Sequence, residues 1–448
     1  MKRILAAALA SACLGAFPRA YAQSLTPPSA PYDAPTQTAG EPAHTEGPHL
    51  RLTFDDAVSR TLEGAPLLRA GDAGIEAAAA AVDQAGVRPN PQVGVEMENF
   101  TGTGPYSDFG STEYTLTYSQ QLERGGKRSA RVALAQADRD VALLDREKSK
   151  LDLVYSVRQA WISVLQTNSE LDNAIERLAL AENIGGIVRR RVNAARDPLA
   201  AGLRAENQIA EARTEVDQAL RAFTSAKIAL AALWGGKDGH FTVDAAEFSQ
   251  LSVSYPSWGQ LATKAATPPD LAALDAQVTR AERSYAVEKT RAKQDPVVGV
   301  GVRRFENGND FAGLVSVSIP IALFDTNRGN INRAMAQRQQ AEWTLAEAKR
   351  RYNGELQVQL AAFNSAKAEA TAIRNDLLPR AQEAVESFRD GYNRGAFSYL
   401  EVADAEKSLV DLRARETAAL SRYHHASAAI DRLTGQIGSL AILEGEGQ

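Results

Sequence analysis

Long stretches without proline limit what this 448-residue chain can fold into. No proline occurs between Pro105 and Pro198, between Pro320 and Pro379, or after Pro379. Because a proline inside a helix costs about 3 kcal/mol, such stretches permit very long helices. A chain of this kind can therefore build helices far longer than those of an ordinary globular domain.

Segment 128–192 shows two offset heptad seams of apolar residues. One seam is Val141, Leu144, Leu151, Tyr155, Ile162 and Leu165, and the other is Val154, Val157, Trp161, Val164, Leu171, Ile175 and Leu178. Two seams on one helix require a neighbour on each side, as in a ring of helices. Such a helix extends for about 100 Å, too long for a compact domain. We expect Gly185-Gly186 and Pro379 to weaken or bend the long helices locally.

The sequence contains an internal repeat, in which the same order of predicted elements occurs twice. LRAENQIAEAR around Ala205 matches VADAEKSLVDLR around Ala405, an offset of 200 residues, and NPQVGVE from Asn90 matches DPVVGVG from Asp295. Each copy reads helix, two strands, long helix, turn and helix. We predict a first repeat over 49–235, a linker over 236–255, a second repeat over 256–436 and a tail over 437–448, with turns at about 193–200 and 391–398.

Four runs alternate between apolar and polar or small residues, which is typical of β-strands. They lie at about 91–100, 112–122, 296–304 and 312–321. Each is long enough for a tilted strand to cross a bilayer, with one face toward lipid and the other toward water. The half-buried sheet of a soluble protein alternates in the same way, so the strands alone leave both possibilities open.

Four strands per chain cannot close a pore, because an open sheet edge cannot lie in lipid. Three chains would supply twelve strands, and a larger ring would also satisfy closure. The fold class we predict is mixed: a long α-helical coiled-coil barrel plus a transmembrane β-barrel with four strands per protomer, internally duplicated and closed as a trimer.

Residues 1–22 have the features of a secretory signal: a basic start, an apolar run and a small-x-small ending at Ala22. We expect cleavage after Ala22, and the alternative is lipidation of Cys13 within a poor lipobox. Residues 23–48 are rich in proline and small polar residues, which predicts a disordered leader.

Composition argues against most other functions. With 50 Lys and Arg against 55 Asp and Glu, the net charge of −5 disfavours a nucleic-acid partner. Cys13 is the only cysteine and the five histidines are scattered, so no metal site is predicted. His424 and His425 point about 100° apart on a helix and are expected on the surface. No catalytic or cofactor-binding residues are predicted either.

The segment from Gly125 to Arg128 reads GGKR and lacks the first glycine and the Ser/Thr of a phosphate loop. We expect it to end the second strand and start the long helix. The chain is thus expected to be no enzyme and to need no cofactor.

The stretch NPQVGVEMENFTGTG, followed by EYTLTYSQQLERGGKRSARVALA, resembles the outer-membrane efflux (TolC-like) proteins, most of all their cobalt-zinc-cadmium resistance (CzcC-type) branch. The likeness covers residues 50–436. It implies a passive homotrimeric exit duct in the outer membrane of a Gram-negative bacterium, with the helical part in the periplasm. It also implies outer-membrane lipid, a periplasmic adaptor (membrane fusion) protein and an inner-membrane RND pump as partners, and divalent metal cations (Co/Zn/Cd class) as cargo.

The segment 391–409 resembles the periplasmic hairpin tip of that family. By resemblance, Glu401 and Asp404 take two acidic gate positions, and Tyr392 takes the place of an aromatic residue that helps to hold the tip closed. Glu401 and Asp404 share one helical face, so a trimer would present six carboxylates that attract cations. The residues expected at the tip turns and the adaptor contact are Asn193, Asn393, Gly395 and Phe397.

Two departures from the family pattern affect the tip. Phe397 stands where an arginine is common, and Ala195 where a glycine is usual. Two other functions also remain open: a duct for organic toxicants or antibiotics, and a periplasmic coiled-coil adaptor or scaffold.

Overall fold

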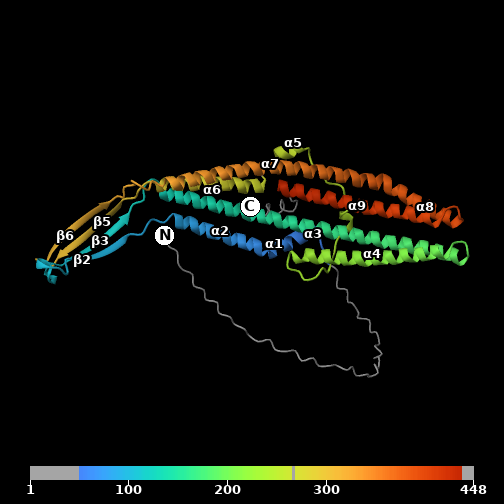
Figure 1. Cartoon of the computed structure of the whole chain (residues 1–448), viewed down its shortest axis with the longest axis horizontal. Coiled ribbons are helices and arrows are strands. Elements are labelled where there is room, and N and C mark those ends of the chain that lie inside the picture. Colours follow the sequence, from blue (N-terminus) through green and yellow to red (C-terminus); the bar gives the residue numbers. More distant parts are fainter. Residues whose placement is uncertain (1–49, 265–267, 436–448) are drawn as a thin grey trace, which may run out of the picture. The chain divides into compact units, whose positions relative to one another are not determined.

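A computed structural model of the chain describes residues 50–264 and 268–435. The expected signal segment 1–22, the leader 23–48 and the tail 437–448 lie outside the described residues. The described residues belong to one structural unit, which combines very long helices with a small sheet (Figure 1).

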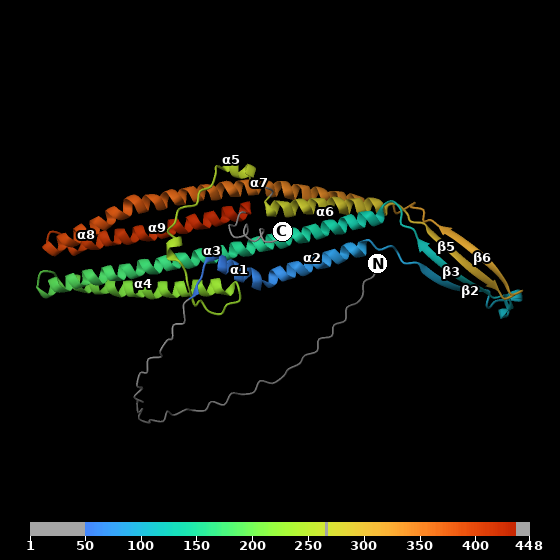
Figure 2. The same ribbon diagram turned by 180° about the vertical axis from the view of Figure 1, so that it is seen from behind.

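The elements follow the chain in two similar runs. The first run is β1 Leu50–Arg51, α1 Phe54–Gly64, α2 Pro66–Ala85, β2 Gln92–Glu98, β3 Glu113–Gln121, α3 Lys127–Asn193 and α4 Leu199–Ala232. The second is β4 Phe241–Thr242, α5 Trp258–Lys264, α6 Pro269–Arg291, β5 Val297–Phe305, β6 Asp310–Ser318, α7 Arg328–Ala372, a π-helical segment Ile373–Leu377, α8 Leu378–Arg394 and α9 Tyr399–Thr434. Within this unit the four-stranded sheet lies at one end of the helices, and the α3–α4 and α8–α9 turns lie at the other (Figure 2). The predicted mixed architecture is confirmed.

Helix α3 runs for 67 residues without interruption. Helix α3 packs on α2, α4, α6 and α9, and the middle parts of both seams are buried in one shared core, whereas Ile175 of the second seam is 48% exposed in the single chain. The expected weak point at Gly185 was wrong. A Cβ there would lie 2.6 Å from Ile209 Cδ1, so the glycine permits close approach of α4 rather than a break. No helix among the described residues is long and apolar enough to cross a membrane.

The second long helix does change its geometry where proline was expected to disturb it. The π-helical segment Ile373–Leu377 separates α7 from α8, and Pro379 lies in the first turn of α8. Proline lacks the N–H that would continue the α-helical ladder, which accounts for the irregular turn before it.

The sheet has the order β2-β3-β5-β6 with antiparallel neighbours, so the two repeats join at β3 and β5. The register divides the side chains between two faces. One face carries apolar side chains that are exposed in the single chain: Val93, Val95, Met97, Tyr114, Leu116, Tyr118, Val300, Val302, Phe311, Val315 and Val317. The other face is mainly polar or small, as the alternation predicted.

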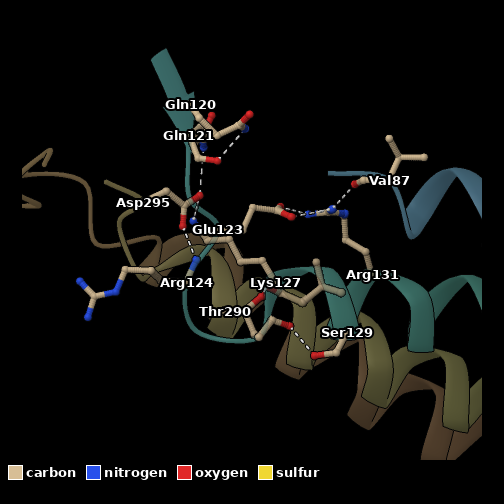
Figure 3. Close-up of polar contacts among 12 residues, drawn as sticks. Val87, Gln120, Gln121, Glu123, Arg124, Lys127, Ser129, Arg131, Thr290 and Asp295 are labelled. Atoms are coloured by element: carbon tan, nitrogen blue, oxygen red, sulfur yellow. Dashed lines mark hydrogen bonds and ion pairs between the residues drawn. The ribbon is translucent and has the colours of Figure 1, made fainter. Parts of the chain in front are cut away.

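Asp295 joins the sheet to the helices (Figure 3). Its carboxylate accepts hydrogen bonds from Lys127 Nζ at 2.7 Å, the Arg124 backbone N–H at 2.9 Å and Gln121 Nε2 at 3.0 Å. Burial opposes ionisation of Asp295, but these three bonds outweigh it and hold its pKa below the usual range. The segment that resembles a phosphate loop therefore ties the first repeat to the second.

The turn before Lys127 explains why α3 begins there. Gly126 has a φ of 79°, a left-handed conformation that glycine adopts without penalty. The prediction that this segment ends a strand and starts the long helix is confirmed.

His424 is buried, so its expected place on the surface was wrong. Its Nε2 lies 2.8 Å from the carbonyl oxygen of Phe248, and the two rings stack with centroids 5.4 Å apart. Burial lowers the pKa of His424. The reason lies outside its own helix: the segment between the two repeats crosses α9 at this point and covers the ring.

Candidate functional site

The turn between α3 and α4 is closed by two backbone hydrogen bonds. The Ala195 N–H donates to the Val192 carbonyl at 2.9 Å, and the Arg196 N–H donates to the Arg191 carbonyl at 2.9 Å. This pattern is a Schellman motif, which ends a helix with a left-handed residue. Ala195 has a φ of 53°, a conformation that costs a residue with a Cβ about 1–2 kcal/mol.

The turn between α8 and α9 repeats this backbone 200 residues later. The Gly395 N–H donates to the Tyr392 carbonyl at 2.9 Å, and the Ala396 N–H donates to the Gly391 carbonyl at 2.8 Å. Gly395 has a φ of 82°, which glycine tolerates. The two turns therefore share one conformation, with a strained alanine in the first and a glycine in the second.

Side chains of the two turns meet around Tyr392, which is 1% exposed. Arg191 donates from Nη1 to the Tyr392 carbonyl at 2.8 Å, and its guanidinium lies 4.5 Å from the Tyr392 ring centroid. Arg191 also binds both carboxylate oxygens of Asp197, at 2.9 and 3.1 Å. The Tyr392 hydroxyl donates to Asp197. We call Arg191, Asp197 and Tyr392 the tip cluster.

The charges of the tip cluster support each other. The Arg191 hydrogen bonds hold the pKa of Asp197 below its usual range despite burial, and the Tyr392 hydroxyl adds to this effect. Burial and the neighbouring Asp197 raise the pKa of the Tyr392 hydroxyl. At neutral pH an ionised carboxylate thus joins a guanidinium from its own turn to a neutral phenol from the other.

Glu401, expected at the gate, contributes to the start of α9. Its Oε2 accepts hydrogen bonds from the Ser398 N–H at 2.7 Å and the Ser398 hydroxyl at 2.9 Å, which forms a capping box. These bonds lower the pKa of Glu401. Asp404 is exposed one turn later. Among the described residues, no hydrogen bond or ion pair joins Glu401 or Asp404 to the tip cluster.

The other expected tip residues are exposed. Asn193 ends α3, and Asn393 lies one residue before the end of α8. The Phe397 ring covers Gly391, where a Cβ would lie 2.2 Å from its Cδ2, and packs on Phe388 with centroids 4.8 Å apart. Phe397 therefore holds the second turn by apolar contact.

Sequence reasoning missed Arg191 and Asp197, although the repeat held a signal for them. At the offset of 200, Arg191 corresponds to Gly391 and Asp197 to Phe397. A complementary pair of charges thus replaces a glycine and an aromatic at the same two places. In residues 50–264 and 268–435, no group of three or more His, Cys, Asp or Glu could hold a metal ion.

Comparison with known proteins places this geometry in a family context. A family model described as "Outer membrane efflux protein" matches residues 57–236 and 263–436. The cobalt-zinc-cadmium resistance protein CzcC of Cupriavidus metallidurans is 29% identical over 84% of this chain and 90% of its own. The nickel-cobalt-cadmium resistance protein NccC of Alcaligenes xylosoxydans xylosoxydans is 25% identical over 62% of each chain.

Solved structures share the fold. A structure of CusC superposes with a TM-score of 0.70 at 19% identity, over 86% of this chain and 92% of that one. The outer membrane protein VceC of Vibrio cholerae superposes with a TM-score of 0.70 at 19% identity, over 85% of this chain and 96% of that one. The duplicated arrangement of long helices and paired strands is therefore that of these proteins.

Proposed function

Because this chain belongs to the outer membrane efflux protein family, we propose that it is the outer-membrane duct through which a tripartite system exports divalent heavy-metal cations. The match to CzcC carries the choice of cargo, since it extends over 90% of a protein whose name assigns it cobalt, zinc and cadmium resistance. In this proposal the duct is passive, and an inner-membrane RND pump and a periplasmic adaptor supply energy and cargo.

Closure into a trimer completes the duct. β2 and β6 are the outer strands of the sheet, and an unpaired edge cannot lie in lipid. Three copies joined edge to edge give a closed ring of twelve strands, with the apolar face toward lipid and the polar face toward the passage. The exposure of Val95 (76%) and Val315 (83%) in the single chain supports this orientation.

The entrance lies at the opposite end, where the two turns meet. The tip cluster holds the turns together within each copy, and Glu401 and Asp404 supply six carboxylates in a trimer. A ring of carboxylates attracts cations and repels anions. Asn193, Asn393, Gly395 and Phe397 form the exposed surface on which the adaptor docks.

The metal content of bacterial cells tests which cargo the duct exports. A strain that lacks this chain but keeps its pump and adaptor should accumulate cobalt, zinc or cadmium, and the restored chain should lower the metal content again. Sensitivity to organic toxicants in the same strains is the control. Unchanged metal content with increased toxicant sensitivity would favour the duct for organic compounds, and a stable monomer in detergent would contradict closure.

The gate is tested separately, in planar bilayers. Glu401→Gln with Asp404→Asn removes both charges while glutamine retains the capping box. We expect this variant to form trimers and lose part of its cation preference. Glu206→Gln, at an exposed acid on α4, is the matched control. Wild-type selectivity in the double variant would move the gate elsewhere.

A further inference from the structure

The polar face of the sheet is strongly acidic at its hairpin end. Its strand residues include four carboxylates, Glu96, Glu98, Glu113 and Asp310, and a single cationic side chain, Arg303. Glu98 lies directly opposite Glu113 in the register, and Arg303 lies opposite Thr115, next to them. These residues belong to the ends of the strands that are farthest from the helices (Figure 1).

Arg303 uses its donors to bridge three strands. From β5 it reaches Glu113 on β3 through Nη1 at 2.6 Å and Glu98 on β2 through Nη2 at 2.8 Å. Its Nε donates to Thr115 Oγ1 at 2.9 Å. The second oxygen of Glu113 accepts from Asn99 Nδ2 at 3.0 Å. A planar guanidinium can satisfy several acceptors at once, which an ammonium group cannot do in a fixed geometry.

Without Arg303, the two glutamates would form a cation site. Side chains directly opposite on antiparallel strands have Cβ atoms about 4.5–5.5 Å apart, and like charges placed so repel each other. A divalent cation relieves that repulsion, since carboxylate oxygens are ligands for such ions. Conduction, however, requires that ions bind weakly enough to leave.

We propose that Arg303 determines how divalent cations pass the outer part of the duct, because it occupies the carboxylates of Glu98 and Glu113 that would otherwise retain them. The inference rests on the proposed function, in which the polar face lines the passage. Arg303 thus keeps the exit attractive to cations, through the remaining acids, without giving them a place to stop.

Arg303→Met tests this role, because methionine removes the charge and keeps an unbranched side chain. We expect the trimer carrying Arg303→Met to bind Co²⁺ about tenfold more tightly than wild type in calorimetry, the size expected from losing one cation beside two carboxylates. The conductance of the variant should fall when Co²⁺ is added on the side of the bilayer that faces the β2–β3 and β5–β6 turns. Adding Glu98→Gln to this variant should abolish both effects.

Arg304→Met is the matched control. Arg304 is the next residue on β5, lies on the opposite face and pairs with Glu306 at 3.3 Å. Arg303→Lys covers the case in which Arg303→Met does not assemble, because lysine retains the charge but not the bridge, and it should show a smaller gain in Co²⁺ binding.

Equal Co²⁺ binding in wild type, Arg303→Met or Arg303→Lys, and Arg304→Met would overturn the inference while leaving the duct intact. Absence of ion conduction in every variant would instead contradict the duct, and with it any role of Arg303 in passage. Tighter binding with reduced conductance, confined to position 303, supports both.

Discussion

The two helical turns share one backbone and are held by different forces. In the first, Arg191 and Asp197 form an ion pair that extends to Tyr392. In the second, the corresponding residues are Gly391 and Phe397, and an aromatic ring covers a glycine. The two copies thus share the backbone hydrogen bonds of the turn but differ in their side-chain contacts. The contacts of the first turn are polar, and those of the second are apolar.

The difference matters because, of these two sets of turn contacts, only the polar one reaches the other repeat. Behind the turns, an apolar cluster also joins the repeats: Ile184, Ile187, Val188, Ala205, Tyr392 and Val402. Arg191 and Asp197 belong to the first turn, but their partner Tyr392 belongs to the second. Phe397 packs within its own hairpin, on Phe388 and Gly391. Loss of the charges should therefore weaken the contact between the turns, whereas loss of the aromatic contact should loosen the second turn alone.

Asp197→Ala should have the largest effect. It leaves the Tyr392 hydroxyl and the Arg191 guanidinium without their acceptor, and breaking such a partly buried pair costs about 3 kcal/mol. Hydrogen exchange of the backbone amides of residues 191–197 should accelerate accordingly. Asp390→Ala, at an exposed acid on α8, is the control. Equal acceleration in both variants would mean that the tip cluster does not hold the turns.

Acidification should weaken the same contact in the unmodified protein. The folded-state pKa of Asp197 is depressed, so its contribution to stability is present above the unfolded value of about 4 and is lost as pH falls through the folded value. A neutral carboxyl still accepts hydrogen bonds, so we expect acidification to destabilise the first turn less than Asp197→Ala does.

The measurement is hydrogen exchange of the backbone amides of residues 191–197, corrected for the intrinsic effect of pH. The second turn should change less below pH 4, and Asp197→Asn should flatten the response. Glu406, whose pKa burial raises to about 7, titrates in a separate range. If exchange still accelerates at low pH in Asp197→Asn, the acceleration arises from a titratable group other than Asp197.

Gly391→Ala tests the apolar turn. The new Cβ would lie 2.2 Å from Phe397 Cδ2, and overpacking of this kind costs about 1–3 kcal/mol. Because Phe397 is 36% exposed and can move aside, we expect the lower half of that range. The hydrogen-exchange rate of the Ala396 backbone amide should rise in Gly391→Ala. Adding Phe397→Ala should return that rate toward the wild-type value. A loss that persists in the double variant would have another cause.

Ala195→Gly should have the smallest effect and the opposite sign. Glycine relieves the left-handed strain of Ala195 but gains freedom in the unfolded chain, so we expect the first turn to be stabilised by less than about 1 kcal/mol. The reciprocal Gly395→Ala should destabilise the second turn by a similar amount. Matching shifts in exchange, of opposite sign, would show that the two turns are equivalent in backbone energetics. Shifts of one sign would break that equivalence.

Local sequence patterns were sufficient to predict most of the fold. The heptad seams and the lack of proline predicted α3 over 128–192, and it extends from Lys127 to Asn193. The alternating runs predicted strands with one apolar face, since a strand repeats every two residues. These features depend on neighbours along the chain, which is why one sequence sufficed to find them.

Contacts between distant segments were missed or misjudged. Gly185 was taken for a weak point because its partner, Ile209, lies on another helix. His424 was expected on the surface because the covering Phe248 belongs to the segment between the repeats. In both cases the decisive atom lies on an element whose position no local pattern gives.

By itself, the sequence determined the duplication, the long helices, the strand pairs and the positions of both turns. Each of these follows from the periodicity of apolar residues or from a sequence motif that occurs twice. The tertiary structure alone decided that Arg191 and Asp197 meet Tyr392 and that Arg303 bridges Glu98 and Glu113. Such contacts join residues from different elements, and their distances depend on how helices and strands pack. Periodicity specifies which face a side chain takes, whereas packing specifies what that face contacts.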